Sequence, residues 1–226
     1  MDSLLMPVLN IPFLEVSLSS DYQEIREKLI QSGVPVPVDK INWADYPYKP
    51  LVQVTCGYSK LYLWLLFEVK NDYFRAKAVA DQEAVWEDSC VEFFFSRERV
   101  GNDSNNGNED VVYRNFEFNA QGFCLSACGT KSDRAFLKPE EMSQILRFPG
   151  GVNSEIPEDG AEFNWELGVA IPLDIIGLKA GSTFWANFYK CGDLTRKPHF
   201  LSWKEISSEE PDFHLPDFFG EAVLFD

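Results

Sequence analysis

The stretch Trp86-Glu-Asp-Ser-Cys-Val-Glu-Phe-Phe-Phe-Ser96 decides the fold class of this chain. From residue 90 onward its side chains alternate, with Val91, Phe93 and Phe95 on one side and Glu92 on the other. Successive side chains of a β-strand point to opposite faces of the sheet. The alternation therefore predicts a strand with one face in an apolar core and one polar face.

Two further segments, Tyr113–Asn119 and Thr183–Lys190, show the same alternation. Their predicted core side chains are Phe116, Phe118, Phe184, Ala186 and Phe188. Their opposite sides carry Glu117, Asn119, Asn187 and Tyr189. If the three strands are neighbours in one sheet, these polar groups gather with Glu92 on a single surface. Carboxylate and amide groups of this kind hydrogen-bond readily to the hydroxyls of sugars.

The rest of the chain also consists mainly of short strand patterns separated by turn residues. Further strands are predicted at Leu51–Tyr58, Leu61–Lys70, Phe123–Cys128, Phe163–Ile171, His199–Trp203 and Glu221–Phe225. Residues Ser20–Gln31 form the one convincing helix, with Ser20 as its predicted N-cap and Gly33 after its end. The predicted fold is all-β: an antiparallel β-sandwich of the immunoglobulin or jelly-roll kind with one short N-terminal helix.

Length and composition favour one large domain over residues 1–226, in which the helix and the Pro-rich extension of residues 1–50 pack on the sandwich. The chain has 226 residues, of which 45% are hydrophobic and 15% aromatic, so it can bury a substantial core. Its formal net charge is -16. An acidic surface repels phosphate backbones and anionic lipids, so no nucleic-acid and no membrane partner is expected. A neutral glycan or a calcium ion is compatible with this charge.

The N-terminal segment and the cysteines bear on the cellular compartment. Residues 1–16 have no basic n-region and contain two prolines, so they are a poor secretory signal. The chain is then cytoplasmic, or its signal lies outside this sequence. The odd number of cysteines, 5, favours mostly reduced thiols that pack as small apolar residues.

Two tryptophans stand beside polar groups at the ends of predicted strands. Trp86 precedes the strand that carries Glu92, and Trp203 ends the segment Pro198-His-Phe-Leu-Ser-Trp203. An indole offers a broad apolar face to the C–H groups of a sugar ring, while neighbouring polar side chains hold its hydroxyls. His199 is close enough in sequence to Trp203 to be a contact at the rim.

The chain resembles carbohydrate-binding module family 9 and the wider DOMON-like group of β-sandwiches, from about Leu51 to its C-terminus. The resemblance rests on the order and spacing of the segments WEDSCVEFFF, YRNFEFNAQG, WELGVAIPLDIIG, ANFYKCGD, PHFLSW and FHLPDFFGEAVLF. It implies a non-catalytic module that grips a mono- or oligosaccharide. It further implies that a structural calcium ion is compatible with the fold, without assigning its ligands, and that a glycoside hydrolase is a suitable partner.

Residue by residue, the resemblance implies that Trp86 and Trp203 are two aromatic walls around a terminal sugar. Glu92 matches an acidic hydrogen-bond acceptor, and Asn119 and Asn187 match amides in the corresponding segments. One position departs from the family, because this chain has Glu117 where some members have an arginine two residues before the amide. That difference removes a cationic donor from the expected site.

Two other functions are compatible with parts of the sequence. Glu92 and Glu117 on one face could act as the paired carboxylates of a glycoside hydrolase. A haem-binding DOMON-type domain would need axial ligands, usually Met and His. The three methionines include Met1 and Met6 at the N-terminus, and no C-x-x-C-H motif is present. Carbohydrate binding without catalysis is therefore the leading hypothesis.

Overall fold

The computed structural model describes residues 8–16, 20–99, 111–150 and 158–225. Its strands are β1 (Leu9–Pro12), β2 (Val34–Pro37), β3 (Lys40–Ile41), β4 (Leu51–Tyr58), β5 (Tyr62–Tyr73), β6 (Cys90–Ser96), β7 (Tyr113–Asn119), β8 (Cys124–Gly129), β9 (Arg134–Phe136), β10 (Leu146–Gly150), β11 (Glu162–Pro172), β12 (Thr183–Cys191), β13 (Phe200–Ser202) and β14 (Gly220–Phe225). The helices are α1 (Tyr22–Ser32), α2 (Pro139–Met142) and α3 (Leu173–Ile176), with 3₁₀ turns at Val85–Glu87 and Pro216–Phe218. None of the helices in these described ranges is long and apolar enough to span a bilayer.

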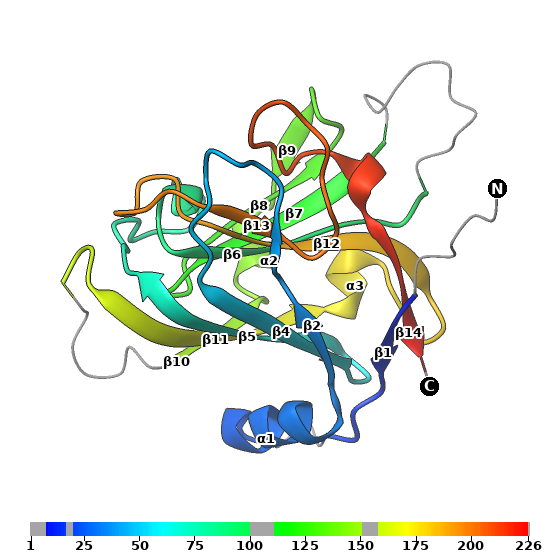
Figure 1. Ribbon diagram of the computed structural model, residues 1–226. Coiled ribbons are helices and arrows are strands. Elements are labelled where there is room, and N and C mark those ends of the chain that lie inside the picture. The colour runs from blue at the N-terminus through cyan, green and yellow to red at the C-terminus, as the bar shows by residue number, and fades with distance from the viewer. Residues whose placement is uncertain (1–7, 17–19, 100–110, 151–157, 226) are drawn as a thin grey trace.

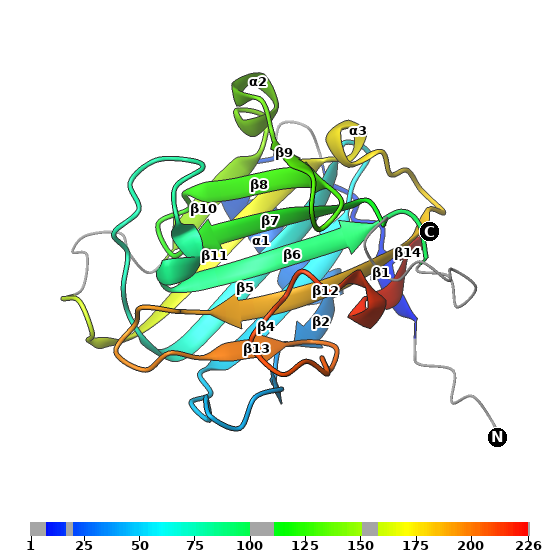
Figure 2. The same cartoon turned by 90° about the horizontal axis from the view of Figure 1, so that it is seen from above.

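The strands form two sheets that pack face to face as a sandwich (Figure 1). The larger sheet has the order β1-β14-β12-β6-β7-β8-β9, and β13 and β3 extend it beside β12. The smaller sheet has the order β10-β11-β5-β4-β2. All pairings within the two sheets are antiparallel except that of β1 with β14. Figure 2 views the larger sheet from its outer side, with the smaller sheet behind it.

The predicted all-β sandwich is confirmed, and most strand boundaries agree within a few residues. The predicted helix is also present, but its cap differs. Asp21, not Ser20, is the N-cap, because its side chain accepts a hydrogen bond from the amide of Glu24 at 3.0 Å. The helix lies on the outer face of the smaller sheet, where Ile25 and Leu29 are buried against Trp64 and its neighbours (Figure 1).

The main core lies between the two sheets. The predicted inward faces of β6, β7 and β12 all contribute to it, together with apolar side chains of β4, β5 and β11. Phe93 is central, since its ring stacks near those of Phe95 and Phe188 with centroids 5.4 and 5.3 Å away. Burial of these large rings is the main favourable contribution to folding.

A charged cluster is buried inside this core. The Lys190 ammonium lies 3.2 Å from Asp72 Oδ2 and 2.8 Å from His199 Nε2, and all three side chains are fully buried. Lys190 also donates to the carbonyl of Cys191 at 2.7 Å, and the Trp165 indole N–H donates to Asp72 at 2.9 Å. Such a cluster is tolerated because its charges are paired and hydrogen-bonded.

Removing one member of this cluster should be costly. We expect Lys190→Met to lower the free energy of unfolding by roughly 3–5 kcal/mol, because the Asp72 carboxylate would stay buried without its counter-charge. Urea denaturation followed by tryptophan fluorescence measures this change. The control is Lys77→Met, since the Lys77–Asp159 pair is 56% and 51% exposed and should contribute less than about 1 kcal/mol. Equal losses in the two variants would contradict this account.

Candidate functional site

The polar side of the larger sheet is not open to solvent over its whole area. A second apolar cluster covers much of it, with Phe94 and Tyr189 of the sheet beneath side chains of the surrounding loops. Among the covering residues, Phe213 stacks on Tyr189 with a centroid distance of 4.1 Å. A pocket of about 320 Å³ lies among these loops on this side of the sheet.

The pocket combines aromatic and charged side chains. It is lined by Trp86, Glu92, Glu117, Arg134, Cys191, Asp193, Phe200, Pro211, Asp212, Phe213 and His214. Of the residues predicted for the site, Trp86, Glu92 and Glu117 come together here. Asn119, Asn187, His199 and Trp203 do not line the pocket.

Trp86 forms one wall, on the 3₁₀ turn that precedes β6. Its side chain is 38% exposed, which is unusual for a large aromatic residue in a chain that buries most of its rings. The backbone of the turn is fixed, because the Trp86 carbonyl accepts from the amide of Asp193 at 3.3 Å and the Glu87 carbonyl accepts from Leu194 at 3.1 Å. The backbone that carries the indole is therefore anchored, while the indole itself stays partly exposed in the lining of the pocket.

Asp88 and Asn119 hold the loop that carries Trp86. Asp88 is fully buried and accepts from the amides of Lys77 and Ala78 at 2.9 and 3.0 Å, and it also pairs with Arg75. The Asn119 amide donates to Asp88 Oδ2 at 3.0 Å. The prediction that Asn119 faces a sugar is therefore corrected, because its side chain hydrogen-bonds to Asp88 and so positions this loop.

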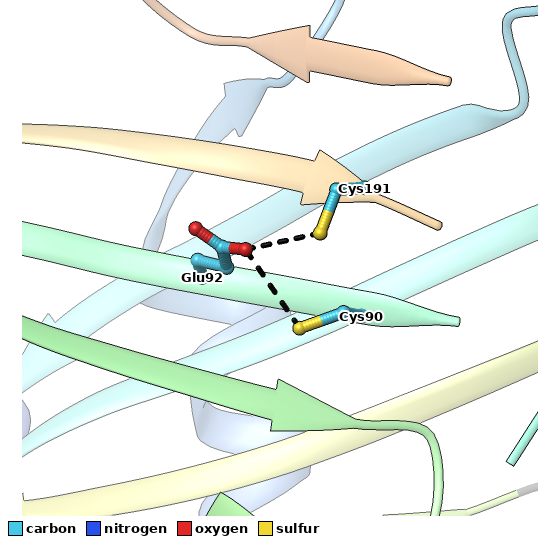
Figure 3. Close-up of side chains that lie close together, drawn as sticks. All are labelled: Cys90, Glu92 and Cys191. Atoms are coloured by element: carbon cyan, nitrogen blue, oxygen red, sulfur yellow. Dashed lines mark hydrogen bonds between the residues drawn. The ribbon is translucent and has the colours of Figure 1, made fainter. Parts of the chain in front are cut away.

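Glu92 forms the floor between two cysteines (Figure 3). β6 and β12 pair with Cys90 opposite Cys191 and Glu92 opposite Tyr189. The Cys191 thiol donates to Glu92 Oε1 at 3.0 Å, and the Cys90 thiol approaches the same oxygen at 3.9 Å. The other oxygen, Oε2, is buried and has no hydrogen-bond partner within the described residues.

Glu117 lies directly opposite Glu92 on the neighbouring strand β7. The two side chains are only 4% and 2% exposed. Burial raises the pKa of Glu117 to about 7, while Arg134 and the Asn115 amide act in the opposite direction. Burial and the nearby Glu117 raise the pKa of Glu92 well above its usual range. Two opposed, buried carboxyls thus retain protons at a pH where exposed ones are ionised.

The pocket also contains a cation that the sequence analysis did not predict. Arg134, on β9, donates to the Tyr113 hydroxyl at 3.0 Å and contacts His214 Nδ1. Burial, followed by the Arg134 charge, lowers the pKa of His214 to about 4, so this imidazole is neutral at pH 7. The pocket therefore contains a guanidinium from Arg134, although Glu117 stands where some family members have an arginine.

Trp203 lies on the other face of the sheet from Trp86. β13 pairs with β12 so that Phe200 is opposite Cys191 and shares its face. The Trp203 amide donates to the Phe188 carbonyl at 2.9 Å, and the two rings are 5.7 Å apart, on the side of the core between the sheets. The expected pair of facing indoles is corrected, since a side chain three positions after Phe200 falls on the opposite face.

His199 and Asn187 are structural as well. His199 is fully buried in the cluster with Lys190, and burial together with that charge lowers its pKa to about 3, so it is not a contact at the rim. The Asn187 amide donates to the Lys204 carbonyl at 3.2 Å, and its oxygen accepts from the Lys204 amide at 2.9 Å. Asn187 therefore fixes the segment that follows β13.

Cys90, Glu92 and Cys191 are also the residues that could hold a metal ion in the described part of the chain. One ligand atom from each lies within 4.8 Å of the others. Two thiols and one carboxylate suit a thiophilic ion such as zinc better than calcium, which prefers six to eight oxygen ligands. Cys90, Glu92 and Cys191 are therefore unsuited to the structural calcium ion that the family resemblance allows.

A larger groove of about 890 Å³ lies under α1, against the smaller sheet. Its aromatic side chains are already engaged: Tyr22 stacks on Phe148 at 4.1 Å, and the Trp64 indole donates to Ser59 at 3.0 Å. The Asp21 side chain in its wall caps the helix. The smaller pocket at Trp86 combines an exposed ring with converging charged groups, and is the better candidate for a ligand site.

Comparisons with known proteins agree with this fold. The sequence profile described as carbohydrate-binding family 9 matches residues 25–224. A Bacteroides uniformis protein, described from its crystal structure as a candidate carbohydrate-binding protein, is 34% identical, with 97% of this chain and 99% of that chain covered and a TM-score of 0.83. No curated protein sequence matches significantly.

Two solved structures of a family 9 module from Caldicellulosiruptor kristjanssonii share the fold at 10% identity. The complex with glucose has a TM-score of 0.59, with 96% of this chain and 95% of that chain covered. The complex with cellotriose has a TM-score of 0.60, with 97% and 94% covered.

The opposed carboxyls should make stability depend on pH. Between the usual carboxyl range and about pH 7, the folded chain keeps a proton on Glu117 that the unfolded chain releases, so raising the pH lowers the free energy of unfolding. We expect Glu117→Gln to flatten this decline between pH 5 and 7, by on the order of 1–3 kcal/mol. Urea denaturation at several pH values measures this pH dependence of the free energy of unfolding. Glu221→Gln, on the exposed side of β14, is the control. A variant as pH-sensitive as the parent would contradict the assignment.

Proposed function

Because the chain belongs to carbohydrate-binding family 9, a family of non-catalytic modules, we propose that the pocket at Trp86 binds the terminal sugar of a glycan. One observation carries this proposal. A single pocket brings together an indole that is 38% exposed and a buried carboxylate oxygen that has no partner. A sugar can engage both, since its ring has an apolar C–H face and a belt of hydroxyls.

The indole of Trp86 supplies the stacking surface. Its turn is anchored by backbone hydrogen bonds to the segment after β12, so little conformational entropy is lost when a ring packs against it. Phe200 and Phe213 line the same pocket and provide apolar contact away from Trp86. This arrangement replaces the second tryptophan wall expected from the sequence.

The floor supplies directional hydrogen bonds. Glu92 Oε1 is occupied by the Cys191 thiol, which leaves Oε2 for a ligand hydroxyl. Glu117 accepts from the Asn115 amide at 2.9 Å through one oxygen, and Arg134 lines the same pocket with its guanidinium. Acceptors and donors in one pocket can fix the orientation of a polyhydroxylated ring.

The two other functions considered for the sequence receive less support. A glycoside hydrolase would be catalytic, whereas family 9 modules are not. Haem ligation would need an accessible histidine, but His199 is fully buried in hydrogen bonds and His214 is engaged with Arg134. A glycoside hydrolase as a partner, and a structural calcium ion, stay predictions.

Affinity should depend on the exposed indole. One stacked aromatic wall and a few hydrogen bonds predict a Kd between about 0.01 and 1 mM. We expect Trp86→Ala to weaken binding of glucose or cellotriose about tenfold or more, since it removes the stacking surface. Isothermal titration calorimetry measures the change.

The control for this experiment is Trp203→Phe. Its ring lies on the core side of the sheet, so the variant should bind sugar as the parent does. Loss of binding in Trp203→Phe, with Trp86→Ala unaffected, would place the sugar elsewhere and contradict the proposal.

A further inference from the structure

The titratable side chains around the pocket are mainly acidic. Four carboxyl groups line it, from Glu92, Glu117, Asp193 and Asp212, against the single guanidinium of Arg134. Asp212 is compensated, because Lys131 lies 2.6 Å from its Oδ2. Within the described residues, no cationic side chain forms an ion pair with the other three.

The Arg134 guanidinium is hydrogen-bonded to uncharged groups, although its charge lowers the pKa of Glu117. Its Nη1 donates to the Tyr113 hydroxyl at 3.0 Å and lies 3.5 Å from Asn115 Oδ1, beside the neutral imidazole of His214. It forms no ion pair with Glu92 or Glu117 within the described chain. Neither carboxyl of the floor is therefore paired with a cation within the described residues.

The positions of Glu92 and Glu117 on the floor of the pocket determine where a cation could bind. Glu92 and Glu117 are paired residues of adjacent antiparallel strands, so their side chains leave the sheet side by side, about 5 Å apart at Cβ. Oε1 of each is already hydrogen-bonded, to the Cys191 thiol and to the Asn115 amide. Glu92 Oε2 is buried and without a partner in the described residues. Like charges in this position repel unless a proton or a cation lies between them.

Resting on the proposed function, we infer that this pocket prefers a sugar bearing a free amino group, that is, an unacetylated hexosamine whose ammonium binds between Glu92 and Glu117. An ammonium group has three donors and no acceptor, which matches a site of closely spaced carboxyl oxygens. The net charge of -16 also favours the approach of a cationic ligand and opposes that of a uronic acid.

A metal ion is the other cation that could compensate these groups. The three potential metal ligands converge on Glu92 Oε1, where the thiols of Cys90 and Cys191 lie (Figure 3). The unpartnered oxygen is the other one. The observations therefore favour a cationic group that arrives from the pocket over an ion held among the thiols.

The test compares four monosaccharides by isothermal titration calorimetry at pH 7 and low salt: glucosamine, glucose, N-acetylglucosamine and glucuronic acid. We expect glucosamine to bind about tenfold more tightly than glucose, because a charge-assisted hydrogen bond replaces a neutral one. N-acetylglucosamine should show no such gain, glucuronic acid should bind least, and added salt should reduce the preference for glucosamine.

Glu117→Gln tests the site directly, because it keeps the size of the side chain while removing its ability to ionise beside an ammonium group. The ratio of the glucosamine to glucose affinities should fall from about ten to about one. Asp159→Asn is the matched control, since its carboxylate pairs with Lys77 outside the pocket and its loss should leave the ratio close to ten.

The outcomes separate this inference from the proposed function. If glucose binds as tightly as glucosamine in the parent protein, the inference is wrong while sugar binding stands. If none of the sugars binds, the proposed function fails and the inference with it. If glucosamine binding disappears after treatment with a chelator, a metal ion is the cation of this pocket and the inference is overturned.

Discussion

The register in which β6 pairs with β7 and β12 determines which side chains meet on the floor of the pocket. The pairing of β6 with β7 sets Glu92 opposite Glu117, and its pairing with β12 sets Cys90 opposite Cys191. The same registration directs phenylalanines into the core between the sheets. Because the side-chain period of a strand is two residues, a slip of β6 by one residue would turn Glu92 toward the core and Phe93 and Phe95 toward the pocket side.

Two loops supply the walls of the pocket, and the larger sheet supplies its floor. The segment held by Asp88 places Trp86 at the mouth of the pocket, and the segment after β13 brings Phe213 and His214 to its other side. Apolar packing on Tyr189 anchors the second segment. The site is thus built from a rigid sheet floor and two loops tied to it, an arrangement that reduces the ordering cost of binding.

Part of this site could be predicted from the sequence, because strand alternation is a local property. The phenylalanines beside Glu92 and Glu117 assign both carboxyls to one polar face. Alternation does not reveal what covers that face, so it also predicts a ligand contact for Asn119 and Asn187, whose side chains bind backbone and loop groups.

The other differences between the predicted and the observed site also arise from contacts between segments far apart in the sequence. Within PHFLSW, Phe200 and Trp203 fall on opposite faces, but only the pairing with β12 shows which of them faces the pocket. Arg134 reaches the site from β9, at the far edge of the larger sheet, and its segment carries no local signal of function. The proximity of His199 to Trp203 in sequence predicts a contact at the rim, whereas in the fold His199 is buried against Lys190 in the core.

The central claim is that the polar floor beneath Trp86 is the carbohydrate site. A crystal structure of the protein soaked with glucose and with glucosamine tests it most directly. The account predicts a sugar ring stacked on the Trp86 indole, with one of its polar groups within hydrogen-bond distance of Glu92 Oε2. A sugar bound instead in the groove under α1, or against Trp203, with the pocket at Trp86 empty, would contradict it.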